Sequence, residues 1–314
     1  MPPADAAAQQ GVLDTLSGSQ LSDPRSRRAR EVHQLTRRVG RERAGRFLAE
    51  GPQAVREAIV AHATLPGAVV HDLFVTEAAA QRYAGELAQA RSAGLVPVLV
   101  SEQVLAAMTE TVTPQGMLAV CASVDRQLHT VLDGLAPTLV AVLAHVRDPG
   151  NAGTVLRTAD AAGADAVVLS SGSVDIHNSK CVRSTAGSIF HLPVVQNVDL
   201  AEALDALRAH GLLILAADAE GAHDLDDLID EAERGAHADE PGGQPPLLAR
   251  PSAWLFGNEA WGLRQQDRAL ADVVVRVPIH GRAESLNLAT AATVCLYASA
   301  RAHRTAGPSS VPGH

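Results

Sequence analysis

Residues 138–164 read TLVAVLAHVRDPGNAGTVLRTADAAGA, and this stretch decides the fold class. Its first nine residues are almost continuously apolar, which is typical of a strand buried on both faces. A polar turn follows at residues 148–151, and a helical pattern then runs through 152–163. A buried strand followed by a turn and a helix is the repeating unit of a parallel sheet that helices cover on both sides.

The same alternation continues on both sides of this stretch. Further buried strands are predicted at 164–170, 211–217, 253–257 and 272–278, with helices around 200–210 and 285–303. A smaller α/β region precedes them. It begins with a helix from Arg25 that includes Phe47, and continues with helices at 50–63 and 78–94 and strands at 69–76, 96–101 and 118–124.

These elements predict two folded domains. We expect a disordered leader at 1–24, a small α/β domain at 25–124, a linker at 125–137, a larger α/β domain at 138–306 and a disordered tail at 307–314. The segment 220–251 is acidic and then rich in glycine and proline, so we interpret it as a solvated surface excursion.

Composition excludes several classes of protein. Hydrophobic residues make up 46 % and charged residues 19 % of the chain, and no apolar run is long enough to span a bilayer. The first ten residues lack the pattern of a secretory signal, so a cytoplasmic enzyme is expected. The three cysteines are far apart, which argues against disulfides, and no metal-ligand spacing occurs, so we predict no metal.

Charge is distributed very unevenly. The net charge is −9, yet residues 25–46 carry nine arginines against Glu31 and Glu42, and residues 218–240 carry ten carboxylates against Arg234. The sign of the net charge therefore does not exclude a nucleic-acid partner. The arginine-rich segment predicts contacts to RNA phosphates through Arg37, Arg38, Arg41 and Arg43. The alternative to RNA binding is that these arginines simply lie on a solvent-exposed helix face.

Three polar loops directly follow predicted strands, at the edge of a parallel sheet where ligands bind. In the first, 145–164, a helix N-terminus can face an anion, and Arg157 falls near Asn151. In the second, 255–263, the glycines of LFGNEAWGL allow main-chain groups to hydrogen-bond an adenine edge or an amino-acid group. In the third, 277–301, Ser285 and Asn287 begin a helix. Taken singly, each also fits an ordinary cap or turn.

Together, in this order and spacing, the three loops resemble the signature motifs of the SpoU (TrmH) family of RNA 2′-O-ribose methyltransferases. The resemblance spans residues 138–303, and residues 27–59 together with TPQGMLAV (113–120) are similar to the small RNA-substrate-binding domain that precedes many members. It implies a C-terminal trefoil knot, whereas the strand pattern alone predicts an unknotted doubly wound sheet. It also implies S-adenosyl-L-methionine as methyl donor and a homodimer formed through the knotted domain.

The resemblance implies site residues by position. The donor pocket is expected to involve Gly257, Asn258, Gly262, Val277, Ile279 and Leu286, and the catalytic set is expected to be Asn151, Arg157, Glu259, Ser285 and Asn287. Arg157 matches the family's proposed activator of the ribose hydroxyl. A guanidinium has no acceptor, so holding a phosphate or stabilising a developing alkoxide is the easier role for it.

Ribosomal RNA is the expected substrate because the N-terminal region resembles those of ribosomal-RNA enzymes, with transfer RNA as the alternative. One rival interpretation is an RNA-binding protein without catalysis, which has no need to retain Arg157, Asn258, Glu259, Ser285 and Asn287 together. Another is an ordinary Rossmann-type enzyme, but no G-x-G-x-x-G or P-loop follows any strand.

Overall fold

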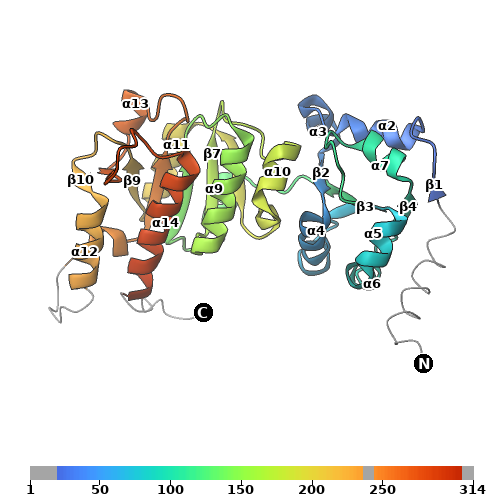
Figure 1. The fold of residues 1–314 in the computed structure, drawn as a ribbon. Coiled ribbons are helices and arrows are strands. Elements are labelled where there is room, and N and C mark those ends of the chain that lie inside the picture. Colours follow the sequence, from blue (N-terminus) through green and yellow to red (C-terminus); the bar gives the residue numbers. More distant parts are fainter. Residues whose placement is uncertain (1–19, 236–243, 306–314) are drawn as a thin grey trace. The chain divides into compact units, whose positions relative to one another are not determined.

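The larger of two sheets has seven parallel strands and carries the three loops singled out above (Figure 1). The structure is a computed structural model, and it describes residues 20–235 and 244–305. Within these residues the chain divides into two compact units. Unit 1 contains the residues up to Val124 together with Asp175–His191, and unit 2 contains Asp125–Val174 and the residues from Leu192 onward.

Unit 2 has the strand order β10-β12-β9-β11-β6-β7-β8. Its strands are β6 (Leu139–Leu143), β7 (Ala166–Ser170), β8 (Val194–Val198), β9 (Leu213–Ala217), β10 (His223–Asp224), β11 (Ser252–Phe256) and β12 (Val273–Arg276). Its helices are α8 (Leu128–Asp133), α9 (Pro149–Ala162), α11 (Leu200–Ala209), α12 (Leu225–Gly235), η2 (Leu247–Ala249), α13 (Gln265–Arg268) and α14 (Leu288–Thr305). The parallel α/β sheet predicted from the alternating pattern is confirmed. The trefoil knot stays a prediction.

The carboxyl ends of three central strands lie level with one another. Phe256 of β11 pairs in register with Leu143 of β6 on one side and with Ala217 of β9 on the other. The loops that follow these strands therefore start side by side at one edge of the sheet, which is where an open parallel sheet binds its ligands.

Helices α9 and α14 pack against each other on one face of this sheet (Figure 1). Helix α9 begins because the Asp148 side chain accepts a hydrogen bond from the backbone N–H of Asn151 (2.8 Å), and it ends at Gly163, whose φ of 76° is left-handed. Helix α14 is tied to the sheet by the fully buried Trp254, whose indole N–H donates to Ser299 Oγ (2.9 Å). The N-terminus of α9 is thus capped beside the loops, and α14 is held against the sheet through its C-terminal half.

Unit 1 has a five-stranded mixed sheet of order β1-β4-β3-β5-β2. Its strands are β1 (Gln20–Leu21), β2 (Arg46–Glu50), β3 (Val70–Val75), β4 (Val98–Val100) and β5 (Met117–Ala122). Its helices are α2 (Arg27–Gln34), α3 (Arg38–Ala44), α4 (Pro52–Thr64), α5 (Glu77–Arg82), α6 (Ala84–Ser92), α7 (Glu102–Met108), α10 (Ser179–Thr185) and η1 (Ser188–Phe190). The predicted small α/β region is therefore present.

The structure differs from the sequence-based expectation at its N-terminal segments. Gln20 and Leu21, assigned to a disordered leader, pair with β4, whereas residues 1–19 lie outside the described residues. The single helix expected from Arg25 is two helices, α2 and α3, and Phe47 belongs to strand β2. The break falls at Thr36 and Arg37, where the chain leaves α2 and Arg37 adopts an extended conformation.

Three further segments differ from expectation. The expected linker at 125–137 contains helix α8, whose Val131 and Leu132 join the core of unit 2. The expected surface excursion contains helix α12, which buries Leu225 and Leu228 and exposes its carboxylates. Residues 175–191, expected in the larger domain, pack with unit 1. The predicted tail at 307–314 lies outside the described residues.

Candidate functional site

The loop after β11 requires glycine at both ends. A Cβ on Gly257 would lie 2.2–2.4 Å from backbone atoms of Gly262 and Leu263, and Gly262 has a left-handed φ of 66°. The backbones of Asn258 and Gly262 exchange two hydrogen bonds of 2.9 Å, which close the loop. Backbone must approach backbone here, so no larger residue fits at position 257.

Asn258 holds this loop from within. It is only 5 % exposed. Its Nδ2 donates to the carbonyl of His145 (2.7 Å), and its Oδ1 accepts from the N–H of Ala260 (2.8 Å). Both its side chain and its backbone are therefore used to hold the loop together.

Glu259 joins the loop after β11 to the N-terminus of α9. Its carboxylate accepts from the N–H groups of Arg147 (3.2 Å) and Asp148 (3.0 Å) and from Asn151 Nδ2 (3.3 Å). A carboxylate at a helix N-terminus also interacts favourably with the helix dipole. Glu259 thus fixes the geometry between two of the three predicted loops.

Asn287 connects the third loop to the same cluster. Its Nδ2 donates to Asn151 Oδ1 (3.1 Å), and its Oδ1 accepts from the N–H of Ala289 (2.9 Å) at the start of α14. Asn151, Glu259 and Asn287 therefore form one hydrogen-bonded chain across three loops that lie far apart in sequence. The structure brings these three predicted residues together.

A cavity of about 530 Å³ lies beside this cluster, at the ends of β9, β11 and β12. Its volume is within the range of roughly 300–1,000 Å³ that is usual for small-molecule and cofactor sites. All six residues expected to bind the donor line it, as do two of the expected catalytic residues: Gly257, Asn258, Gly262, Val277, Ile279, Leu286, Glu259 and Ser285. The side chain of Ser285 is exposed at this cavity.

The chemistry of the cavity fits S-adenosyl-L-methionine. The close-packed glycine loop offers backbone groups, and Ile279 and Leu286 offer exposed apolar surface at 37 % and 36 % exposure. Asp218 and Glu220 also line the cavity and pair with Arg268, the former at 3.1 Å. Carboxylates here can accept hydrogen bonds from ribose hydroxyls or an ammonium group.

The sequence-based prediction missed Asp218, Glu220 and Arg268. Asp218 and Glu220 follow β9 directly. The rule that ligands bind at the carboxyl ends of strands therefore pointed to them, but no motif did.

Arg157 lies apart from the hydrogen-bonded chain. It is exposed on α9 and makes no hydrogen bond or ion pair with any described residue. The guanidinium is therefore available to an anionic ligand, and its catalytic role stays a prediction.

A second basic feature at this edge was also missed. The exposed indole of Trp261 has the guanidinium of Arg147 5.0 Å and that of Arg264 5.9 Å from its ring centroid. Both arginines are exposed. An exposed aromatic ring can stack on a base of a single strand, and arginines beside it can bind the phosphates. Both arginines lie in loops after strands, which is the signal that was available in the sequence.

The predicted RNA-binding arginines of α3 separate into two kinds. Arg37, Arg38 and Arg43 are exposed, although Arg38 pairs with Glu42 (2.7 Å). Arg41 is only 4 % exposed. Its guanidinium binds Asp175 Oδ2 through two N–H groups (2.7 and 2.9 Å) and the carbonyls of Leu35 and Thr36 (3.0 and 2.7 Å).

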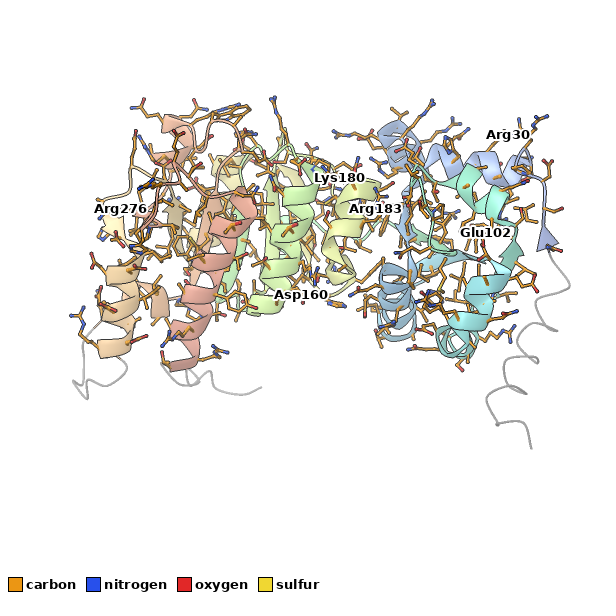
Figure 2. The ribbon with its side chains drawn as sticks, in the orientation of Figure 1. Arg30, Glu102, Asp160, Lys180, Arg183 and Arg276 are labelled. Atoms are coloured by element: carbon orange, nitrogen blue, oxygen red, sulfur yellow. The ribbon has the colours of Figure 1, made fainter. Side chains whose placement is uncertain are left out.

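The assignment of Arg41 to RNA binding is therefore wrong, because its donors are used inside the protein. On α2, Arg30 is exposed and makes no ion pair with the described residues (Figure 2). Arg30, Arg37 and Arg43 are therefore exposed arginines of this segment that make no ion pair with the described residues.

Metal-ligand clusters, membrane-spanning helices and the cysteines also bear on the class of site. Within residues 20–235 and 244–305, no cluster of three or more histidine, cysteine or carboxylate side chains is arranged to hold a metal ion. None of the helices in those ranges has both the length and the apolar character needed to cross a bilayer. All three cysteines are buried.

Comparison with known proteins gives matches to both parts of the chain. Residues 138–297 match the model of the SpoU rRNA Methylase family, and residues 27–119 match the MRM3-like substrate binding domain. The 23S rRNA (guanosine(2553)-2′-O)-methyltransferase RlmP of Bacillus subtilis is 33 % identical over 278 residues, covering 88 % of this chain and 98 % of that protein.

Solved structures agree with this assignment. The AdoMet-bound rRNA methyltransferase from Sinorhizobium meliloti superposes with a TM-score of 0.72 at 26 % identity, covering 90 % of this chain and 97 % of that one. The SpoU methyltransferase AviRb from Streptomyces viridochromogenes, in complex with AdoMet, has a TM-score of 0.67 at 29 % identity, covering 88 % and 98 %. The motifs, the fold and the relatives agree, and the chain belongs to the SpoU rRNA methylase family.

Proposed function

We propose that this protein is an RNA methyltransferase that transfers a methyl group from S-adenosyl-L-methionine to a ribose 2′-hydroxyl of ribosomal RNA. The observation that carries the proposal is the cavity at the ends of β9, β11 and β12, which adjoins the hydrogen-bonded chain of Asn151, Glu259 and Asn287. Membership of the SpoU rRNA methylase family and the 23S rRNA methyltransferases among its relatives support the substrate. We also propose a cytoplasmic location, which such a substrate supports.

When bound, S-adenosyl-L-methionine would supply an electrophilic methyl group to the ribose 2′-oxygen, which would lose its hydroxyl proton, and S-adenosylhomocysteine would be the leaving product. The residues of this chain mainly position the two reactants, since orientation alone can remove a large part of such a barrier. The glycine loop at 257–262 shapes the donor cavity. Glu259 and Asn287 hold this loop and the start of α14 at fixed distances from α9.

Arg157 is proposed to act on the RNA. Its exposed guanidinium can bind the phosphate next to the reacting ribose and stabilise negative charge that develops on the 2′-oxygen. A guanidinium stays protonated, so the proton of the hydroxyl must pass to another acceptor, such as an RNA phosphate.

We further propose a homodimer formed through unit 2. Val294 and Tyr297 lie one turn apart on α14 and are 39 % and 47 % exposed, which gives this helix an apolar surface strip. Sedimentation velocity at micromolar concentration is expected to give a dimer, and a monomer would contradict this part of the proposal.

The test of the main proposal is methyl transfer from radiolabelled S-adenosyl-L-methionine to ribosomal and transfer RNA, followed by mapping of 2′-O-methyl sites. We expect label in ribosomal RNA at a ribose 2′-oxygen. Arg157→Ala is expected to lower the turnover rate by roughly 10²–10³-fold, as loss of a charge-stabilising donor does in other enzymes. Donor affinity, measured by calorimetry, should stay within a few-fold.

Arg304→Ala is the matched control, because Arg304 is exposed at the far end of the neighbouring helix α14. It should leave both quantities unchanged. Label only in transfer RNA would overturn the substrate, and label on a base would overturn the reaction.

A further inference from the structure

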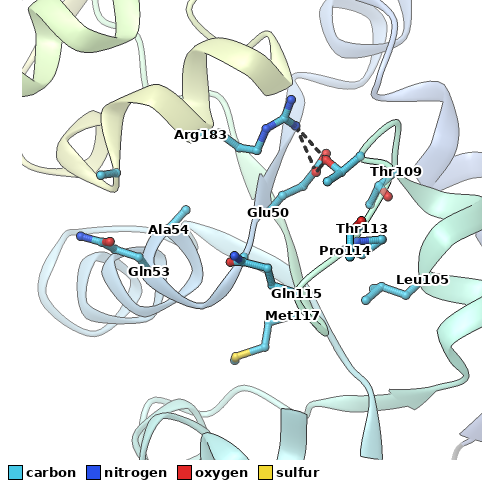
Figure 3. Close-up of a pocket in the computed structure, with 13 residues that line it drawn as sticks. Glu50, Gln53, Ala54, Leu105, Thr109, Thr113, Pro114, Gln115, Met117 and Arg183 are labelled. Carbon is cyan, nitrogen blue, oxygen red and sulfur yellow. Dashed lines mark hydrogen bonds and ion pairs between the residues drawn. The ribbon is translucent and has the colours of Figure 1, made fainter. Parts of the chain in front are cut away.

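A second cavity, of about 290 Å³, lies entirely within unit 1, where strand β2 ends and helix α4 begins (Figure 3). We call it the Glu50 pocket, after the residue at the end of β2. The segment 109–117 and helix α10 close its other sides. It contains none of the residues that the proposed methyl transfer uses.

Two buried oxygen atoms in this pocket have no hydrogen-bond partner within the part of the chain that the structure describes. Glu50 is 9 % exposed. One carboxylate oxygen, Oε2, accepts from Arg183 Nη1 (3.1 Å) and from the Thr111 hydroxyl, but Oε1 has no hydrogen-bond partner among the described residues. The hydroxyl of Thr109, which is 6 % exposed, has none either. A buried polar group without a partner costs about 1–3 kcal/mol, so two in one pocket indicate a ligand that completes them.

The charge of the pocket decides which ligand chemistry fits. The unpartnered Glu50 oxygen accepts hydrogen bonds and repels anions, so a phosphate group is a poor occupant. A ligand with N–H groups on one edge suits it. The Arg183 side chain, 39 % exposed and held by Glu50, adds donors at the rim.

Helix α4 adds donors next to this carboxylate. Its N-cap is Gly51, which has no side chain to cap the helix, and its first residue is Pro52. The N–H groups of Gln53 and Ala54 therefore have no partner within the helix, and both residues line the pocket. A ligand edge that carries both donors and an acceptor would satisfy the carboxylate and these N–H groups together.

Guanine has such an edge. Its N1–H and exocyclic amino group are adjacent donors that can share the one unpartnered carboxylate oxygen, Glu50 Oε1, and its O6 beside them is an acceptor that matches helix N–H groups. The apolar side chains of Leu105, Pro114 and Met117 line the pocket and can contact the faces of a flat ring (Figure 3). A cavity of 290 Å³ has room for one base, with the sugar and phosphate left outside.

We propose that the Glu50 pocket receives one unpaired guanine of the RNA substrate, and so gives the substrate-binding unit a base-specific contact. This proposal rests on the proposed function for the identity of the substrate as RNA. Sequence-specific RNA recognition commonly uses single-stranded bases that are turned out of a loop and bound at their Watson–Crick edge.

The test uses the full-length protein and fluorescein-labelled RNA hairpins that are identical except for one central loop base: guanine, inosine, adenine, cytosine or uracil. Fluorescence anisotropy at low salt gives the Kd for each hairpin. The guanine hairpin is expected to bind at least about tenfold more tightly than the adenine, cytosine and uracil hairpins, as one good carboxylate–base pair provides. Inosine, which lacks the amino group, should fall between them.

Glu50→Gln should abolish this preference. The substitution replaces one of the two carboxylate oxygens, which accept hydrogen bonds, with an amide NH2 group, which donates them. Thr109→Val keeps Glu50 and its ion pair, and it should reduce the preference by about threefold through loss of one hydrogen bond. Thr109→Val therefore also decides the question if Glu50→Gln fails to fold. Glu86→Gln is the matched control, since Glu86 is a carboxylate of unit 1 that pairs with Arg56 on the surface. It should leave the preference intact.

Equal or unmeasurable binding of all hairpins by the wild-type protein overturns the proposal. So does a guanine preference that Glu50→Gln or Thr109→Val leaves unchanged, because a water molecule would then complete the pocket. Methyl transfer to ribosomal RNA is measured on the same preparation. Methyl transfer without base preference refutes the pocket alone, whereas a preference that depends on Glu50 without methyl transfer to any RNA refutes the proposed function alone.

Discussion

Replacing Arg41 with methionine should destabilise unit 1, whereas the same change at Arg43, two residues away, should not. Arg41 is buried and its guanidinium makes two hydrogen bonds to Asp175 and two to backbone carbonyls. Arg43 is exposed and makes no ion pair with the described residues. The two positions therefore separate a structural arginine from one that is available to RNA.

The magnitude follows from what the substitution leaves behind. Asp175, whose side chain is 13 % exposed, loses both donors to its Oδ2, although its Oδ1 still accepts from the N–H of His177 (2.8 Å). Removing one partner of a buried ion pair costs about 3–5 kcal/mol. With a urea m-value of up to about 3 kcal/mol/M, the unfolding midpoint of unit 1 should fall by at least roughly 1 M. Arg43→Met should change the free energy of unfolding of unit 1 by less than about 0.5 kcal/mol.

The measurement can distinguish the two units because both tryptophans, Trp254 and Trp261, lie in unit 2. Tryptophan fluorescence should therefore report an unchanged transition in Arg41→Met, while far-ultraviolet circular dichroism shows the shift. Adding Asp175→Asn should recover part of the loss, since it removes the unpaired charge. The reasoning is refuted if Arg41→Met is as stable as Arg43→Met, or if it weakens RNA binding while unit 1 keeps its full stability.

Other substitutions test the site and the core. Gly257→Ala should weaken binding of S-adenosyl-L-methionine by more than about tenfold in calorimetry, because its Cβ would overlap backbone atoms; unchanged affinity would exclude this loop from the donor site. Glu259→Gln puts a donor against a backbone N–H and should lower both donor affinity and the rate of methyl transfer, and an effect on neither would contradict its positioning role. Burial raises the pKa of the Cys121 and Cys295 thiols, so a thiol reagent at pH 8 should label these two only after urea unfolding; rapid labelling of the native protein would show that they are accessible.

Local pattern predicted the elements of unit 2 well. Buried parallel strands are continuous apolar runs, and this property is visible along the chain without knowledge of their neighbours. The strands at 166–170, 213–217, 252–256 and 273–276 were predicted within two residues, and the predicted strand at 138–146 ends three residues beyond the observed strand at 139–143. Strand β8 (Val194–Val198) was not predicted. The motif resemblance indicated which of the following loops form the donor cavity, and all six of the residues expected there line it.

Weak or mixed patterns were misinterpreted. Helix α12 carries many carboxylates, and this charge led to the prediction of a surface segment. The helix nevertheless buries Leu225 and Leu228. Helix α8 is only six residues long, so it offers too little periodicity to stand out from a linker. Strand β1 has only two residues, too few to show a pattern, and it is a strand because it pairs with β4.

Sequence by itself determined the two α/β parts, the family and the segments that carry the site, because apolar periodicity and motif spacing are properties of neighbouring residues. Tertiary structure alone decided what individual polar side chains do. Arg41 and Arg43 look equivalent in sequence, and only the approach of Asp175, 134 residues away, buries one of them. The Glu50 pocket likewise arises from segments 50–54, 105–117 and 183–186, which fold together. Burial and hydrogen bonding depend on contacts between residues that are distant along the chain, and the pattern of neighbouring residues does not reveal those contacts.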